Sequence, residues 1–429
     1  MLNTASNIKK APLFLLALVF FALFYSESGA LQPSDPEELT TTPHAGIECV
    51  SCHDNTPEFH RKKQKEVDCL TCHDRHGDTT TRDAHIGVTC QACHMEAVSP
   101  KRIPGSNIVK GETIKKSLVD SHAHDMFAVN DARICRRCHF QGNRIGAASM
   151  VLPEKGMLCA PCHAAIFSMG SAYMPVFLLF ALLGLLITVS VWLSGSAPGD
   201  PDKNMLLKIL DFFVIASKTV FSVKFGLIIR TLIFEVFLQR RLYRLSFIRW
   251  LIHGLIFFPL VFRFLWGIAE RFASNWLLNQ SIIGFLLDKN DPISGILFDM
   301  TGVMMVMGVV FASFRKKHDH PDALFDSPKQ DRWSLILIGG IVCIGFILEG
   351  IRIAMTGWPN GSGYAVFGYG ISLLFAGMTD LTDIYGYVWH VHSVLTGLLI
   401  LYLPFSRLMH MIIAPTVLVM NAVTENGKN

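Results

Sequence analysis

The stretch Trp333–Met355 reads WSLILIGGIVCIGFILEGIRIAM and decides the class of fold. An α-helix rises about 1.5 Å per residue, so this stretch is long enough to cross roughly 30 Å of hydrocarbon. Four other stretches have the same character, which gives five expected spans: 173–194, 250–269, 293–314, 333–355 and 386–409. The sequence therefore predicts a mainly α-helical membrane protein built on a five-helix transmembrane bundle.

The composition of the whole chain agrees with a membrane protein and excludes some other classes. Of its 429 residues, 51% are hydrophobic and only 17% are charged, whereas soluble domains carry about 25% charged residues. The net charge of +4 is small. The basic residues surround apolar segments and form no contiguous patch with interleaved aromatic residues, so no nucleic-acid partner is expected.

The N-terminus has the features of a secretory signal peptide over residues 1–30. Lys9 and Lys10 precede an apolar run from Ala11 to Tyr25, and small residues end the segment at Ser28–Ala30. An uncleaved membrane anchor is the alternative. Both interpretations place residues 31–172 outside the cytoplasm, in the periplasm if the source is a Gram-negative bacterium.

Loop charges indicate the orientation of the spans. The loops 195–249 and 315–332 hold fourteen Lys and Arg residues, whereas 270–292 and 356–385 hold two. Positive loops face the cytoplasm, so we expect 270–292 and 356–385 outside and the C-terminus in the cytoplasm of an inner-membrane protein. The segment 205–238 is apolar but interrupted by charges, which predicts amphipathic helices at the cytoplasmic interface.

The exported domain, 31–172, contains ten of the eleven cysteines and repeats one motif, Cys-x-x-Cys-His, five times. Two thiols at this spacing form thioethers to the vinyl groups of one haem, and the adjacent His binds the iron. Disulfides and zinc sites are the alternatives, but neither requires a His after every pair. The five motifs consist of Cys49, Cys52 and His53; Cys69, Cys72 and His73; Cys90, Cys93 and His94; Cys135, Cys138 and His139; and Cys159, Cys162 and His163.

About 28 residues per haem are too few for a conventional apolar core, so we expect a small, loop-rich pentahaem cytochrome c domain in which the haems form the core. Each low-spin haem needs a second axial ligand. Met95 and Met126 are alternative ligands, and which residue serves which haem stays open. The six remaining histidines of the domain are the main candidates: His44, His60, His76, His85, His122 and His124.

Histidines also occur in the expected membrane domain, 173–425. His392 and His410 are 18 residues apart, which is five helical turns, so on one helix they would share a face about 27 Å apart along the axis. Ionisable groups inside a membrane are costly and usually functional. Two haems stacked across the bilayer would use this spacing, and a pair of interfacial histidines is the alternative.

Three segments resemble the nitrate reductase gamma-subunit family, which includes the cytochrome b subunits associated with heterodisulfide reductase and dissimilatory sulfite reductase. They are Arg249–His253, Tyr387–His392 and Pro404–His410, within a similarity that covers roughly 173–425. The resemblance implies a cytochrome b bundle in which His253 and His410 bind one haem b near the cytoplasmic face. It also implies a docking face for a cytoplasmic iron–sulfur subunit of the heterodisulfide reductase type.

The resemblance makes His392 the ligand of a second haem b. Its usual partner is a second His further along the His253 helix, where this chain has Phe262-Arg263. The expected content is therefore one or two haem b. His392 or His390 could instead be the distal ligand of a haem c at the membrane surface.

Four ionisable residues are expected at the depth of the outer leaflet: Arg263, Asp299, Glu349 and Arg352. Structural ion pairs between helices are one interpretation. The other is a quinone site, in which Glu349 or Asp299 accepts a proton and an Arg orients a quinone carbonyl.

The predicted function is respiratory electron transfer between menaquinone or menaquinol and periplasmic cytochromes or reductases, through haem b and five haem c, with quinol oxidation preferred. The alternative is a conduit without its own quinone site that links the periplasmic haems to a cytoplasmic iron–sulfur partner. A haem-based sensor is disfavoured because little chain follows His410 for an output domain.

Overall fold

The structure is a computed structural model that describes residues 69–73, 85–96, 98–113, 126–127, 131, 133–193, 205–222, 224–276, 282–318 and 330–425. The expected signal peptide and the whole first Cys-x-x-Cys-His motif, with Cys49, Cys52 and His53, lie outside the described residues. So do five of the distal candidates: His44, His60, His76, His122 and His124.

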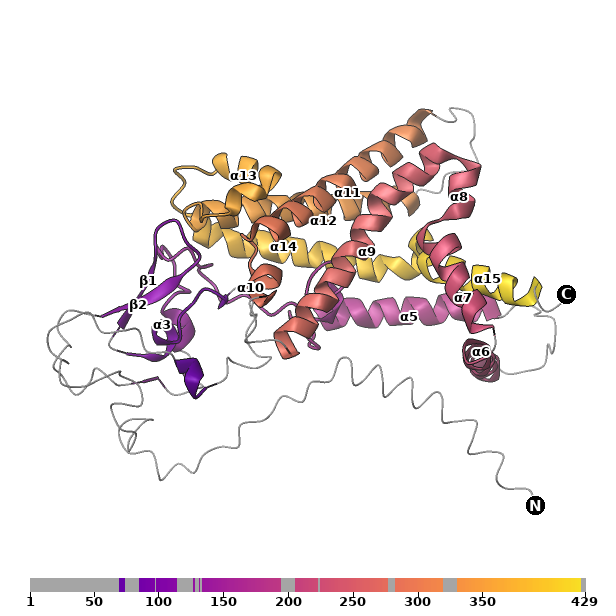
Figure 1. Cartoon of the computed structure of the whole chain (residues 1–429), viewed down its shortest axis with the longest axis horizontal. Coiled ribbons are helices and arrows are strands. Elements are labelled where there is room, and N and C mark those ends of the chain that lie inside the picture. Colours follow the sequence, from indigo (N-terminus) through magenta and orange to yellow (C-terminus); the bar gives the residue numbers. More distant parts are fainter. Residues whose placement is uncertain are drawn as a thin grey trace, which may run out of the picture.

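Five long helices form the body of the membrane domain (Figure 1). Neighbours pack in the order α9, α11, α12, α14, α5. Large apolar side chains such as Leu186, Ile187 and Ile336 remain exposed on them, as expected for helices that face lipid. The five helices are α5 (Met174–Leu193), α9 (Phe247–Trp276), α11 (Pro292–His318), α12 (Gln330–Met355) and α14 (Leu381–Tyr402).

The prediction of five spans is wrong by one helix. Six helices among the described residues are long and apolar enough to cross a membrane, and the last of these segments is Arg407–Thr424. The expected span 386–409 is divided, because α14 ends at Tyr402 and α15 (His410–Glu425) begins after two short 3₁₀ turns. Pro404 lies in the first turn and cannot donate a backbone hydrogen bond, and the hydroxyl of Ser406 accepts one from the Leu408 amide and caps the second.

The segment 205–238 forms short helices, none of them among the six candidate spans. They are α6 (Met205–Val220), α7 (Phe225–Thr231) and the π-helical turn η6 (Leu232–Phe237), followed by α8 (Arg240–Leu245). α15 packs against α7 and η6, and the Lys224 ammonium donates a 3.0 Å hydrogen bond to the Val423 carbonyl. α15 therefore packs with these short helices and continues the chain beyond the end of α14.

The N-terminal domain has few regular elements. A hairpin of β1 (Val98–Arg102) and β2 (Val109–Thr113) pairs Val98 with Thr113. Short helical turns carry the cysteine motifs, and the described part is loop-rich, as expected. These turns are η3 (Cys69–Thr71), α3 (Cys90–His94), α4 (Arg133–Arg136) and η5 (Met157–Cys159).

The N-terminal domain packs against one end of the bundle, beside the short helices α10 (Ile282–Leu287) and α13 (Val366–Leu373) (Figure 1). Its hairpin is held by Asn107, whose amide donates to Asp288 at 2.6 Å. The Gly105 carbonyl accepts from the Asn360 amide at 2.8 Å. Asp288 and Asn360 belong to the two loops expected outside, whereas the basic helix α8 lies at the opposite end (Figure 1).

Candidate functional site

Each Cys-x-x-Cys-His motif within the described residues forms one helical turn. The backbone amide of the His donates to the carbonyl of the first Cys, at 2.9 Å for His73, 3.0 Å for His139 and 3.0 Å for His163. The motif of His94 is itself the helix α3. Residues four apart lie on one face of a helix, so the turn presents the first thiol and the imidazole on the same side, as attachment to one haem requires.

The motifs differ in whether the structure describes them and in how exposed their cysteines are. The first motif lies outside the described residues, so the assignment of Cys52 as a thioether and His53 as an iron ligand stays a prediction. In the second motif the Cys72 amide donates to the Cys69 carbonyl at 3.3 Å, which closes the turn, but Cys72 is exposed. Cys72 therefore has the spacing of a thioether but is more exposed than Cys138, Cys159 and Cys162 of the fourth and fifth motifs.

Within the described part no disulfide joins the motif cysteines Cys72, Cys90, Cys93, Cys135, Cys138, Cys159 and Cys162. Burial raises the pKa of the Cys138 thiol to about 11, and it also raises the pKa of the Cys159 and Cys162 thiols. A free thiolate in such surroundings would carry the cost of a buried charge. An uncharged thioether has no such cost.

Three pairs of histidines face one another at nearly the same separation. The ring centroids lie 6.2 Å apart for His85 and His139, 6.2 Å for His163 and His392, and 5.8 Å for His253 and His410. A metal–imidazole bond is about 2 Å long, so two rings on opposite sides of one iron would have centroids about 6 Å apart. All three pairs therefore fit two axial ligands of a haem.

Hydrogen bonds orient several of these rings for binding through Nε2. The Nδ1 atom of His139 lies 2.7 Å from the Ala148 carbonyl, and that of His410 lies 2.6 Å from the Arg407 carbonyl. A carbonyl can only accept, so Nδ1 carries the proton in both rings. Ligand histidines usually donate their second N–H in this way, which leaves Nε2 free for a metal.

The His253–His410 pair lies at the basic end of the bundle, between α9 and the first residue of α15. The resemblance predicted this pair, and the structure brings the two rings together. The accompanying argument, that His392 and His410 share one continuous helix, is wrong because the chain leaves α14 at Tyr402.

Gln239 is a site residue that the sequence analysis missed. Its side-chain oxygen lies 3.0 Å from His253 Nδ1, and the residue is 7% exposed with a backbone φ of 54°. That left-handed conformation is uncommon outside glycine, and it follows a π-helical turn, an element often found at functional sites. In the sequence Gln239 stands before two Arg residues, and this pattern gives no sign of the role.

We expect Gln239→Ala to weaken haem b binding about 10- to 100-fold, because outer partners of metal ligands contribute about that much to affinity. Occupancy after detergent purification, measured by the haem b absorbance per chain, would report the loss. Gln239→Glu retains an acceptor for Nδ1 and should keep the haem. Equal occupancy in Gln239→Ala and wild type would contradict the assigned contact.

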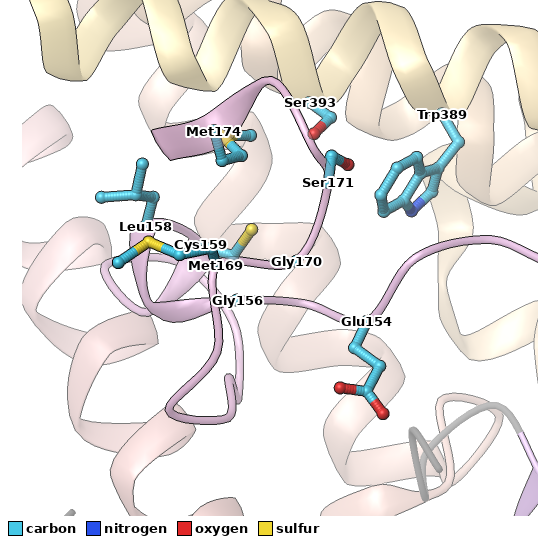
Figure 2. A pocket seen from close by; sticks show the side chains of 10 residues that line it. All are labelled: Glu154, Gly156, Leu158, Cys159, Met169, Gly170, Ser171, Met174, Trp389 and Ser393. Carbon is cyan, nitrogen blue, oxygen red and sulfur yellow. The ribbon is translucent and has the colours of Figure 1, made fainter. Parts of the chain in front are cut away.

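The His163–His392 pair joins the fifth motif to α14. Burial, followed by the charge of Lys155, lowers the pKa of His163 well below its usual range, and neutral imidazole is the form that binds metals. Cys159 and Gly156, from the loop that holds the fifth motif, line a slight hollow together with Trp389 and Ser393 of α14 (Figure 2).

His390 has a different environment from His392. Its Nδ1 atom lies 3.0 Å from the Tyr173 hydroxyl, and the two rings make an edge contact. Tyr173 directly precedes α5, so this contact fastens α14 to the start of α5.

The four ionisable residues expected at the outer leaflet have distinct contacts. Asp299 is 2% exposed, and its carboxylate accepts hydrogen bonds from the Phe367 amide at 3.0 Å and the Gly368 amide at 3.1 Å. These bonds cap the first turn of α13. The Arg263 guanidinium donates to Thr301 and to the Phe298 carbonyl and lies over the Phe298 ring.

Glu349 and Arg352 form the remaining pair, with Oε1 and Nη2 3.8 Å apart. The same Arg352 Nη2 atom is buried and makes no hydrogen bond in the described part, while Nη1 donates to Asn290 at 2.9 Å. The Asn290 amide donates in turn to Asn107 at 2.5 Å. A polar chain therefore runs from Glu349 to the N-terminal hairpin.

The comparisons with known proteins concern the C-terminal part of the chain. Residues 291–424 match the family model of the nitrate reductase gamma subunit. This gamma-subunit region contains α11 to α15, and with them Glu349, His392 and His410. The region is shorter than the expected similarity over 173–425, and it includes neither His253 nor the five cysteine motifs.

A curated relative is similar over a short segment. The EtfAB:quinone oxidoreductase of Syntrophomonas wolfei is 26% identical over 122 residues, which are 26% of this chain and 17% of the relative. The matched segment thus spans less than a fifth of that protein. No solved structure gives a significant match. Together, the six apolar helices and the family match over residues 291–424 indicate an integral membrane protein with a region similar to the nitrate reductase gamma subunit.

Proposed function

We propose that the chain transfers electrons between the membrane quinone pool and covalently bound haems c at the outer face, through a haem b held by His253 and His410. The observation that carries this proposal is the facing pair itself, with centroids 5.8 Å apart. One of its two members lies inside the gamma-subunit region. The quinone is supported by the printed name of the relative and by the half-buried Glu349–Arg352 pair.

The haems, when bound, supply one-electron redox chemistry, and the chain supplies ligands, orientation and surroundings. Gln239 and the Arg407 carbonyl contact Nδ1 of His253 and of His410, so Nε2 of each ring would be available to bind a haem iron. Towards the other face, the fifth motif and the facing pair of His85 and His139 provide further haem positions. Menaquinol oxidation with delivery to periplasmic cytochromes or reductases is the direction we propose.

Quinol oxidation releases two protons with its electrons, so a proton acceptor must lie at the quinone site. Glu349 is the candidate, because the Asp299 carboxylate is occupied by two backbone amides. Arg352 has a hydrogen-bond donor available for a quinone carbonyl. From Glu349, the polar contacts through Arg352, Asn290 and Asn107 lead towards the side where the N-terminal domain lies, so Glu349 lies at the outer end of the bundle.

Glu349→Gln is expected to lower the rate of quinol oxidation about 100-fold, since a positioned acid or base contributes about 10²- to 10⁴-fold. The measurement is reduction of the chain's own haems by a menaquinol analogue in a stopped-flow spectrophotometer. Dithionite-reduced haem spectra should be unchanged. Glu235→Gln is the matched control, because Glu235 pairs with Arg240 at the opposite, basic end. A wild-type rate in Glu349→Gln would remove Glu349 from the site.

The same measurement distinguishes a chain with its own quinone site from the alternative, a conduit without one. If the purified chain cannot be reduced by a quinol analogue, but co-purifies with an iron–sulfur subunit that reduces its haems, it is a conduit without its own quinone site. The basic residues Arg241 and Arg244 are exposed on α8, which packs against the His253 helix α9, and such a partner would dock there.

A further inference from the structure

The fifth cysteine motif belongs to the membrane bundle as much as to the N-terminal domain. His163 faces His392 of α14 with ring centroids 6.2 Å apart and ring planes inclined by 63°. The corresponding values for His253 and His410 are 5.8 Å and 68°. At the basic end of the bundle, His253 of α9 therefore pairs with His410 of α15. At the end beside the N-terminal domain, His392 of α14 pairs with His163 of the fifth motif.

The helix α9 has a glycine, Gly267, where the loop of the fifth motif packs against it. A Cβ atom on Gly267 would lie only 2.9 Å from the backbone carbon and oxygen of His163, so the loop packs directly on the helix backbone. Gly267 follows His253 by 14 residues, close to four turns, which puts both on nearly the same face of α9. The motif loop thus occupies the side of α9 from which a second helix histidine would have to project.

The ring of His392 packs against α12. A Cβ atom on Gly345 of α12 would lie 3.7 Å from His392 Cε1, so this glycine leaves room for the ring. The Ile341 backbone of α12 is within hydrogen-bonding reach of the ring, and the buried Nδ1 atom has no partner at ordinary hydrogen-bond geometry in the described part of the chain. An imidazole that is held by a backbone carbonyl through one ring nitrogen can bind a metal through the other.

Backbone hydrogen bonds hold the shape of the fifth-motif loop, which packs against α14. The Met157 amide donates to the Ser168 carbonyl at 2.8 Å, and the Ile166 amide donates to the Lys155 carbonyl at 2.9 Å. These bonds close the loop on itself, and η5 packs against α14. In Figure 2 the loop with Cys159 lies beneath α14, from which Ser393 and Trp389 project towards it.

We propose that the haem attached at Cys159 and Cys162 has His163 and His392 as its two axial ligands, so that a covalent haem c takes the outer position in the bundle. This inference rests on the proposed function, which supplies the covalent haems. The inference predicts one haem b per chain, at His253 and His410, because His392 is an axial ligand of the haem c. The haem c at His392 would also shorten the electron path, since Gly267 lies about 21 Å along α9 from His253.

The test compares His392→Ala with wild type in the purified, haem-loaded full chain. Pyridine haemochromogen spectra should give five haem c and one haem b in both proteins. In His392→Ala one haem c should become five-coordinate, seen as a new high-spin signal in electron paramagnetic resonance and as binding of one additional carbon monoxide per reduced chain. His390→Ala, two residues away and bonded to Tyr173, is the matched control and should show neither change.

Two outcomes would overturn the inference. If wild type holds two haem b and His392→Ala loses one while its haem c stays unchanged, His392 binds a haem b. If His392→Ala changes no coordination, His392 is not a ligand. Should His392→Ala fold poorly, His392→Gly assayed with added imidazole should recover the low-spin signal. Wild-type chain without covalent haem, or without haem b, would instead refute the proposed function.

Discussion

Replacing His253 with alanine is expected to remove haem b and to slow electron transfer from quinol to the haems c by more than about 100-fold. Even an outer partner of a metal ligand is worth about 10- to 100-fold, and His253 is placed as a direct ligand, 5.8 Å from the ring of His410. The haem b count per chain and the rate of haem c reduction by a menaquinol analogue measure the two effects.

The control for His253→Ala must remove a histidine from the membrane domain without removing a ligand. His390→Ala meets this condition, because the His390 ring bonds to Tyr173 and faces no other histidine in the described residues. Wild-type haem b content in His253→Ala would refute the assignment of the pair. Loss of haem b with an unchanged rate would show that quinol delivers electrons to the haems c directly.

The double replacement of Cys159 and Cys162 with alanine is expected to remove one haem c and to interrupt the path between haem b and the outer haems. The fifth motif contacts both α9, at Gly267, and α14. With quinol present, haem b should therefore remain reduced while the other four haems c reduce at least about 100-fold more slowly. Stopped-flow spectra at the separate haem b and haem c bands would follow both.

Cys343→Ser is the matched control for the double replacement. Cys343 is an exposed free thiol on α12, outside any Cys-x-x-Cys-His motif, so its loss should change neither the haem count nor the rates. Rapid reduction of the remaining four haems c in the double variant would mean that electrons bypass the fifth haem. An unchanged count of five would show that the motif does not attach a haem.

Apolar stretches long enough to span a membrane could be recognised from the residues alone, because burial in lipid depends on local composition. The end of a helix was harder to predict. The run 386–409 is apolar throughout, yet Pro404 and Ser406 divide it. The prediction of the His253–His410 pair did not depend on a continuous helix, since it came from the resemblance of the two segments, and their rings do lie together.

Features encoded within a few neighbouring residues could be predicted from the sequence: the helical membrane class and the Cys-x-x-Cys-His turns, whose first Cys and His lie four apart. Which distant groups meet depends on the tertiary packing. It set His163 against His392, placed Gln239 on His253, and used Asp299 to cap α13. Such contacts join residues 14 to 229 positions apart. They arise from the packing of whole helices and loops, so no local spacing could reveal them.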